Sequence, residues 1–524
     1  MFLQENALHS LLLITYQTMI YRINAMKTIR AFDDDTIMEI FGHEAAEDDD
    51  IERLKKFYFK NAAYSRLRAN NPLRLLIGHK GIGKSAMLAV AAREDTAQHK
   101  LSILLRPDDI DEIDIENVAM NAQIRAWKDG FLRIIGEKIF ESFSIKGLFN
   151  QCEHAATWAA IASDFGRTVV GMLNKNSIKL ESSRQMVLDQ FCSNNVIRIY
   201  IDDLDRGWTA TPSSVMRMSA MLNAVRDITR MHKNIHFIIS LRSDVFYLVR
   251  TSDESTDKLE SACIWFSWTN HEILAMLVKR VKTYFGLPCP TDEALVQMDQ
   301  RQLAIDLGRI MTSRFHGRGL WDNVPIHRIL TTLIRRRPRD LVKLCTLAAR
   351  NAYENGRNII DTQDFDKVFD RYSQDRLQDT VNEYKSELPN IQELLENMKP
   401  SQYQRKNAGK NCGVHKFLFS TADIIKKIDT ICQGHHFKFY GTRVNADPKD
   451  IVHFLYKIGF ITARKEIESG KIIRHYFEEQ NYVSSRYADY GCAWEIHPAY
   501  RWALSPYDKS VTDEIEILES SIEC

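Results

Sequence analysis

The sequence carries almost no net charge, and it lacks any uncharged apolar run long enough to cross a membrane. Its 524 residues carry 70 basic and 69 acidic side chains, so a nucleic-acid partner would need a local basic patch. The stretch 155–173 is rich in small apolar residues, but Asp164 and Arg167 interrupt it. The run 11–14 has no basic region before it and no small-residue cleavage site after it. We therefore expect no membrane anchor and no signal peptide, and the sequence leaves open whether Met1 or Met26 is the start.

Cysteine pairs at C-x-x-C spacing are also absent. The nine cysteines are scattered, which is typical of reduced thiols in a cytoplasmic protein. Two Cys-x-x-His pairs could close a tetrahedral zinc site, although they lie in an otherwise ordinary helical stretch; they are Cys412 with His415 and Cys432 with His435. No nuclease, protease, deaminase or NADase motif is recognisable. Any effector activity is therefore expected in another chain.

What the sequence does contain is G-x-x-x-x-G-K-S at residues 78–85, between an apolar run at 73–77 and a helix-forming run at 86–92. A strand, a glycine loop and a helix in this order predict a phosphate-binding loop, because the loop N–H groups and the helix N-terminus face the same anion. The alternative is a structural glycine turn. We expect nucleotide contacts from Gly78, His79, Lys80, Gly81, Ile82, Gly83, Lys84, Ser85 and Ala86. Lys84 would hold the β- and γ-phosphates and Ser85 would ligate Mg²⁺.

A second motif supplies carboxylates. The β-branched run 196–201 ends in Asp202-Asp203-Leu204-Asp205-Arg206, and a buried parallel strand delivers such residues to the ligand-binding edge of its sheet. Asp202 is the candidate Mg²⁺ partner, Asp203 the candidate that polarises water, and Asp205 its substitute. The alternative is an acidic turn. Because no Asn-Lys-x-Asp guanine-reading motif follows, ATP is favoured over GTP.

Several arginines are placed to report the nucleotide state. A third strand, 235–241, ends in Arg242, which could stabilise the γ-phosphate or pair with a nearby aspartate. Arg206 could reach a nucleotide in a neighbouring subunit or pair locally. Arg337 and Arg339 precede a helix and could close onto nucleotide; a solvated helix start and a nucleic-acid phosphate contact are the alternatives.

These elements predict an α/β protein of four regions. An N-terminal extension spans 1–50, and a P-loop NTPase core with a parallel sheet spans 51–268, with a helical insertion at about 115–191. A helical lid at 269–400 and a winged-helix-like α+β domain at 401–524 follow.

The winged-helix prediction depends on a helix that opens at Asp447-Pro448 and on two following strands, 460–465 and 471–477. Basic residues on these elements could contact DNA phosphates; they are Lys449, His453, Lys457, Arg464, Lys465, Lys471 and Arg474. Acidic neighbours such as Glu466 and Glu468 interrupt this set. The same charges could therefore be the solvated face of a protein-interaction module.

The glycine loop, the Asp-Asp-Leu-Asp-Arg string and the strand end at 241–246 resemble those of bacterial P-loop ATPases near the KAP and STAND groups. The segments 337–341, 372–377 and 494–499 are similar to a soluble branch of that assemblage. The resemblance implies a switch or sensor ATPase in defence against phage, whose nucleotide state gates an effector. Some KAP relatives carry membrane spans, and this implication is not carried over.

Together these observations predict a Mg²⁺-dependent ATPase that uses positioning and charge neutralisation rather than covalent catalysis. We expect a cytoplasmic homo-oligomer acting with a separate effector protein. The competing hypothesis is a DNA-associated motor or loader that binds DNA through the C-terminal domain. A third class is a nucleotide-binding scaffold that does not hydrolyse ATP.

Overall fold

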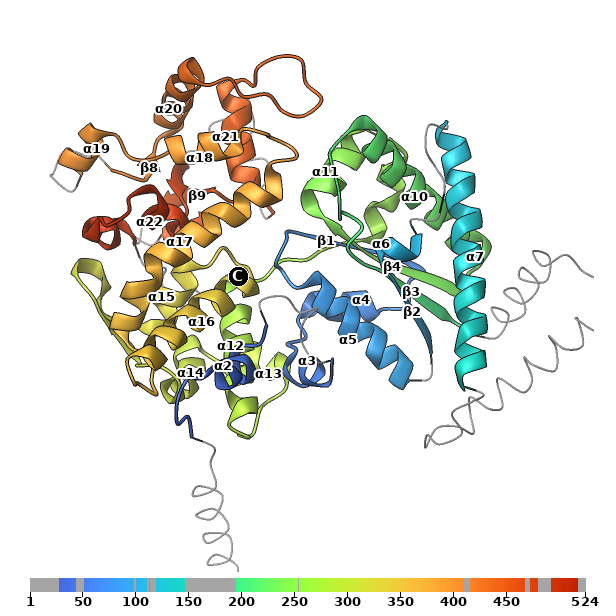
Figure 1. The fold of residues 1–524 in the computed structure, drawn as a ribbon, viewed down its shortest axis with the longest axis horizontal. Helices are drawn as coiled ribbons and strands as arrows, with labels where there is room; N and C mark the ends of the chain where they lie inside the picture. Colours follow the sequence, from blue (N-terminus) through green and yellow to red (C-terminus); the bar gives the residue numbers. More distant parts are fainter. Residues whose placement is uncertain are drawn as a thin grey trace, which may run out of the picture.

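The computed structural model describes residues 28–43, 51–98, 100–110, 113, 119–146, 195–252, 254–408, 415–466, 472–478 and 492–516. Most of the predicted insertion, the acidic run at 47–50, Cys412 and Lys471 lie outside these ranges. The described chain forms a half built on a parallel sheet and a helical half that includes the C-terminal domain (Figure 1). No helix within the described ranges is long and apolar enough to span a bilayer.

The first half is organised by a five-stranded sheet in the order β2-β3-β4-β1-β5, in which every pairing is parallel. Its strands are β1 (Leu73–Gly78), β2 (Leu101–Leu105), β3 (Ile197–Ile201), β4 (Ile235–Arg242) and β5 (Cys263–Trp265). The three strands predicted from the runs 73–77, 196–201 and 235–241 are confirmed as β1, β3 and β4. Because β4 lies between β1 and β3, Arg242 is brought directly beside Gly78. This is the α/β fold of a P-loop NTPase core.

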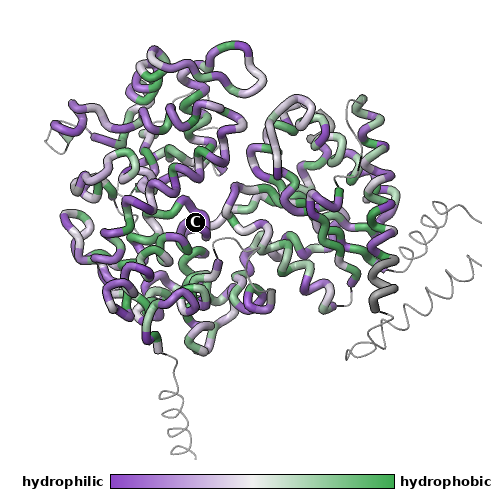
Figure 2. The backbone as a smooth tube through the Cα atoms, in the orientation of Figure 1, coloured by the Kyte–Doolittle hydropathy of each residue, from purple (hydrophilic) through white to green (hydrophobic). Residues whose placement is uncertain are grey.

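Helices cover both faces of this sheet, as its buried strands require (Figure 1). One face packs against α5 (Lys84–Ala97), with α4 (Ala62–Arg68) alongside. The other packs against α7 (Met120–Lys146), α10 (Pro212–Met231) and α11 (Ser243–Ser252). The hydrophobic stretches of the trace follow the central strands, and hydrophilic ones are common on the outer loops (Figure 2).

Helix α7 begins the region that the sequence assigned to an insertion. It packs on the sheet, where the Phe131 and Phe237 rings meet edge to face at 5.6 Å. This described part of the region therefore belongs to the hydrophobic core of the first half. Three short helices complete this half and the segment before it: α2 (Asp34–Phe41), α3 (Ile51–Phe57) and α6 (Pro107–Ile110).

The region predicted as a lid begins with α12 (Asn270–Tyr284), where Thr269 caps the helix in a reciprocal capping box with Glu272. Its other long helices are α16 (Pro338–Glu354) and α17 (Thr362–Tyr384), and α2 packs against α12 and α16. The remaining lid elements are α13 (Asp292–Gln297), α14 (Gln300–Ile305), β6 (Arg314–His316), β7 (Asp322–Pro325), α15 (Ile326–Leu333) and α18 (Ile391–Asn397).

The C-terminal domain combines helices with a four-stranded antiparallel sheet in the order β10-β9-β11-β8. The predicted helix opening at Asp447 and the predicted hairpin are confirmed as α21, β9 and β10. The elements are α19 (Gln402–Asn407), β8 (Leu418–Phe419), α20 (Thr421–Gly434), α21 (Pro448–Lys457), β9 (Ile461–Glu466), β10 (Ile472–His475), β11 (Ala493–Ile496) and α22 (Arg501–Leu504).

Much of the basic set considered either for DNA contact or for a solvated interaction face is instead paired inside the protein. Lys457 Nζ lies 2.7 Å from Glu387, Arg464 pairs with Glu516, and buried Arg474 lies 2.6 Å from Glu495. The His453 ring packs against Phe477. A cation removed from water needs a carboxylate nearby, and strand and helix packing supplies one in each case. Of the predicted set, Lys449 and Lys465 are exposed in the described structure.

Candidate nucleotide site

The glycine loop adopts the backbone that a phosphate site needs. Gly81 has φ 75° and Gly83, which caps α5, has φ 99°, both in the left-handed region that favours glycine. A Cβ on Gly81 would also lie 3.2 Å from Arg339 Cδ. Lys84 Nζ donates to the carbonyls of Gly78 at 2.8 Å and His79 at 3.0 Å. Burial lowers the pKa of Lys84, and Asp205 and Asp202 oppose that shift.

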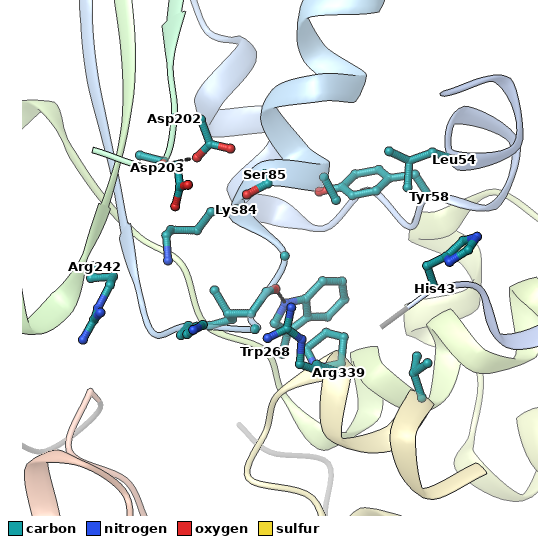
Figure 3. A pocket seen from close by; sticks show the side chains of 18 of the residues that line it. His43, Leu54, Tyr58, Lys84, Ser85, Asp202, Asp203, Arg242, Trp268 and Arg339 are labelled. Carbon is teal, nitrogen blue, oxygen red and sulfur yellow. Dashed lines mark hydrogen bonds between the residues drawn. The ribbon is translucent and has the colours of Figure 1, made fainter. Parts of the chain in front are cut away.

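One cavity of about 460 Å³ brings the loop and the acidic strand end together. Lys84, Ser85, Asp202 and Asp203 all line it; the Asp202 and Ser85 side chains point toward each other, and the Asp203 carboxylate lies near Lys84 (Figure 3). The Ser240 hydroxyl of β4 donates a short hydrogen bond to Asp202 and so orients its carboxylate. A serine hydroxyl and one aspartate suit Mg²⁺, which takes few protein ligands and completes its shell with phosphate oxygens and water.

The three acidic residues have different surroundings. Asp203 is exposed on the cavity wall and has φ 57°, a left-handed conformation that aspartate tolerates better than most residues. Asp205 lies 3.5 Å from Arg242, and burial raises its pKa while Arg242 and Lys84 oppose the shift.

Arg242 itself is held by three groups. Its guanidinium pairs with Asp244 at 2.8 Å and with Asp205, and it donates to the Glu383 carbonyl at 2.6 Å. Burial would lower the pKa of Arg242, but the surrounding carboxylates raise it well above its usual value. The salt-bridge alternative is therefore realised. Arg242 also lines the cavity, and its contact with the γ-phosphate stays a prediction.

The opposite end of the cavity is aromatic and apolar. Leu54 and Tyr58, from α3 and the residue after it, lie there with His43, far from Arg242 (Figure 3). Met276 of α12 also lines the cavity. The Tyr58 hydroxyl is buried and has no hydrogen-bond partner among the described residues. Such an orphaned donor suits a polar edge of a bound base.

Sequence reasoning missed this end of the site. Its residues come from the segment before the loop and from the region predicted as a lid. Each of these segments has the composition of an ordinary helix, with no motif that marks a ligand-binding residue. It also missed Trp268, whose indole Nε1 donates to the Ile82 carbonyl at 2.8 Å and fixes the loop. An indole N–H usually finds a partner when buried, but sequence alone does not say which.

The arginine cluster before α16 is not a solvated helix start, because Arg335 and Arg337 are each 6% exposed. Arg335 bonds Asp340, and Arg336 lies over the Tyr476 ring at 4.4 Å. Only two members of this cluster, Arg337 and Arg339, were predicted to contact the nucleotide. Arg339 lines the cavity and approaches Gly81.

Arg337 is placed differently from the expectation. It is not among the residues that line the cavity, and it donates to the Lys80 carbonyl at 3.2 Å while pairing with Glu383 at 2.8 Å. Arg337 therefore holds the loop backbone from behind, instead of facing the phosphates. Gly78 and His79 are likewise outside the cavity lining.

Two loop residues are contacted by distant elements. Glu383 of α17 accepts from the Lys80 N–H at 3.1 Å, and burial would raise its pKa, but Arg337 and Arg242 hold it well below the usual value. His79 Nδ1 lies 2.9 Å from the Tyr384 hydroxyl, and His79 Nε2 contacts Glu478, just beyond β10. The lid and the C-terminal domain therefore both bind the loop directly.

The candidate zinc ligands that the structure describes, His415, Cys432 and His435, do not gather into a site. Within the described residues, no group of three or more His, Cys, Asp or Glu side chains could hold a metal ion. Cys412 lies outside these residues. Cys432 packs against the core, and His435 Nδ1 lies 3.3 Å from Glu393.

The chain is similar to one family of helical domains and to one transposon protein. Residues 311–381, from just before β6 into α17, match the FunZ-associated C-terminal helical domain. Across 536 residues the chain is 23% identical to the transposon gamma-delta 80.3 kDa protein of Escherichia coli (strain K12), which covers 91% of this chain and 70% of that protein.

Among solved structures, the chain is similar to the Walker-type ATPase of Pyrococcus abyssi, at 12% identity and a TM-score of 0.36, covering 81% of this chain and 95% of that one. It is also similar to the ORC2 protein of Aeropyrum pernix in its ADPNP–ADP complexes, at 12% identity and a TM-score of 0.37, covering 94% and 98%. At these scores the likeness carries no argument about function.

Proposed function

We propose that this protein is a Mg²⁺-dependent ATPase. The observation that carries the proposal is that the Lys84–Ser85 turn and Asp202 line one cavity, although they are far apart in the sequence. Ser85 and Asp202 would hold Mg²⁺, which when bound neutralises charge on the phosphate oxygens. Lys84 would leave its loop carbonyls to bind the β- and γ-phosphates together with the N–H groups of residues 80–86.

Hydrolysis requires a positioned water, and Asp203 is the residue proposed to orient it. Its carboxylate lies on the cavity wall beside Lys84 (Figure 3). Arg339, from the lid, would contact the phosphates across Gly81. Arg242 would stabilise the γ-phosphate end while it remains anchored by Asp244.

A switch role follows from the contacts around the loop. Glu383 and Arg337 hold the Lys80 backbone, and His79 reaches the C-terminal domain through Glu478. A shift of the loop on phosphate binding would therefore change contacts with both the helical region 269–400 and the C-terminal domain. By resemblance we assign the protein to the sensor or regulatory ATPases of bacterial defence complexes, acting on a separate effector.

A homo-oligomer is part of this proposal. Arg206 is exposed at the cavity and makes no ion pair with a described carboxylate, so it could serve a nucleotide bound by a neighbouring copy. The paired charges on α21 and the hairpin give the DNA motor less support than the switch.

The test is phosphate release from ATP by the purified chain with Mg²⁺ or with EDTA. We expect Mg²⁺-dependent release by the wild type and none by Lys84→Ala. Lys233→Ala removes an exposed lysine at the other end of β4 and should match the wild type. Release at the wild-type rate from Lys84→Ala would refute the site, and tight ATP binding without release would favour the scaffold.

A further inference from the structure

The C-terminal domain contains a second large cavity, far from the nucleotide site. It is an open groove of about 940 Å³ between the α18–α19 turn and α20. These elements lie at the outer edge of the helical half, away from the five-stranded sheet (Figure 1). A cavity of this size is within the range of ligand-binding sites, so its chemistry indicates what it could hold.

The groove is basic. Four cations line it, Lys399, Arg405, Lys426 and Lys427, against the single carboxylate of Asp423. That carboxylate accepts from the Ser420 hydroxyl at 2.7 Å at the start of α20. An anionic ligand would therefore meet an excess of positive charge in a chain whose overall charge is close to zero.

Three of these cations are available to a ligand. Lys399, Arg405 and Lys426 are exposed, and their side chains make no ion pair with a described residue. Lys427 is held inside the groove by the Lys399 carbonyl at 2.9 Å, and burial lowers its pKa to about 8. The groove thus presents mobile charges at its rim and a fixed one within.

Aromatic side chains accompany the charges. Tyr403 lines the groove and is 66% exposed. Lys399 and Arg405 also line an adjoining cavity of about 380 Å³, where Pro506 and the carboxylates of Glu396 and Asp508 lie, so the excess of positive charge is confined to the groove. Tyr507, the residue after Pro506, is 91% exposed and has φ 64°, an unusual conformation for tyrosine. Exposed rings beside a cationic track are the features that bind unpaired bases.

We propose that this groove binds single-stranded nucleic acid, with Lys399, Arg405 and Lys426 on the phosphates and Tyr403 stacked on a base. The aromatic rings favour this ligand over an acidic peptide, which offers charge without flat faces. A concave groove also fits a flexible strand better than the convex backbone of a duplex. The proposal concerns a different surface from the hairpin charges discussed above, and it does not depend on ATP hydrolysis.

The test is fluorescence anisotropy with labelled single-stranded oligomers of about 20 nucleotides, as DNA and as RNA. Three phosphate contacts predict that log K falls with log salt with a slope of about −2 for the wild type. Lys399→Ala, Arg405→Ala and Lys426→Ala should each reduce the slope by about 0.7. Tyr403→Ala should weaken binding roughly tenfold.

Matched controls are Lys438→Ala and Arg443→Ala, which remove exposed cations from the segment between α20 and α21 of the same domain, outside the groove lining. We expect both to bind like the wild type, and circular dichroism verifies that every variant is folded. The proposal is overturned by three results: no binding at low salt, groove variants that bind like the wild type, or a duplex or polyglutamate that binds as tightly. Preference between DNA and RNA identifies the natural strand.

Discussion

Replacing Glu383 with glutamine tests whether the lid holds the nucleotide loop by charge. Glutamine keeps the size of the side chain and an acceptor for the Lys80 N–H, which Glu383 accepts at 3.1 Å. It removes the negative charge 2.8 Å from Arg337, in a pair whose side chains are 7% and 2% exposed. The variant therefore leaves a buried guanidinium with a weaker partner.

The size of the effect follows from this geometry. Removing one member of a buried ion pair costs about 3–5 kcal/mol, and a charge-assisted hydrogen bond contributes about 1.5–3 kcal/mol. Since glutamine still offers an oxygen to Arg337, we expect Glu383→Gln to lower the free energy of unfolding by about 2–3 kcal/mol. Arg337→Gln should cost a similar amount, and the double variant should cost less than the sum.

Urea unfolding of the four proteins at neutral pH measures the coupling, which we expect to exceed about 1 kcal/mol. Because the folded-state pKa of Glu383 lies below its ordinary 4.5, the stabilisation is present above pH 4.5 and is lost as pH falls below it. The gap between wild type and Glu383→Gln should therefore narrow in acid. Additive single-variant effects, or a gap that is constant with pH, would refute the ion-pair account.

Three further predictions concern the site and the lid. Asp203→Asn should bind ATP normally but release phosphate about 10²–10⁴-fold more slowly; loss of ATP binding in titration calorimetry would contradict a water-orienting role. Arg339→Ala should weaken ATP binding about 10- to 100-fold and ADP binding less, and equal losses would exclude a γ-phosphate contact. Burial lowers the pKa of His327 from 6.5 to about 4, so the unfolded chain takes up a proton at this residue before the folded protein does. The free energy of unfolding should therefore fall by about 3 kcal/mol as pH falls from 6.5 to 4. His327→Gln should flatten that slope in urea titrations, and an unchanged slope would show that another group titrates.

The sequence predicted the parts of the fold that short segments determine. The strands that carry the glycine loop, the aspartates and Arg242 are apolar runs with a polar end, and a parallel sheet brings such ends to one edge. The opening of α21 at Asp447 could also be predicted, because capping residues act within one turn of the helix.

Contacts between distant elements could not be predicted in this way. Glu383 lies 303 residues from Lys80, and nothing in the local pattern of α17 marks it as a ligand of the loop. Arg337 and Arg339 are two positions apart at the start of α16, where side chains two residues apart point to different sides. Only the packing of the lid shows that Arg339 faces the cavity and Arg337 faces Glu383.

The surroundings of the charged residues on the β9–β10 hairpin also could not be predicted from the sequence. Arg474 was expected on a solvated surface, yet it is buried beside Glu495 of β11. Composition indicates that a strand carries cations. The order of strands in the sheet decides whether a carboxylate lies across from them.

The central claim is that a triphosphate and its metal are bound between Ser85 and Asp202, and calorimetric titration of ATP with and without Mg²⁺ tests it most directly. We expect Mg²⁺ to tighten ATP binding to the wild type and to change the ATP affinity of the Ser85→Ala, Asp202→Asn double variant little. If the double variant responds to Mg²⁺ as the wild type does, or if the wild type does not bind ATP, the account is contradicted.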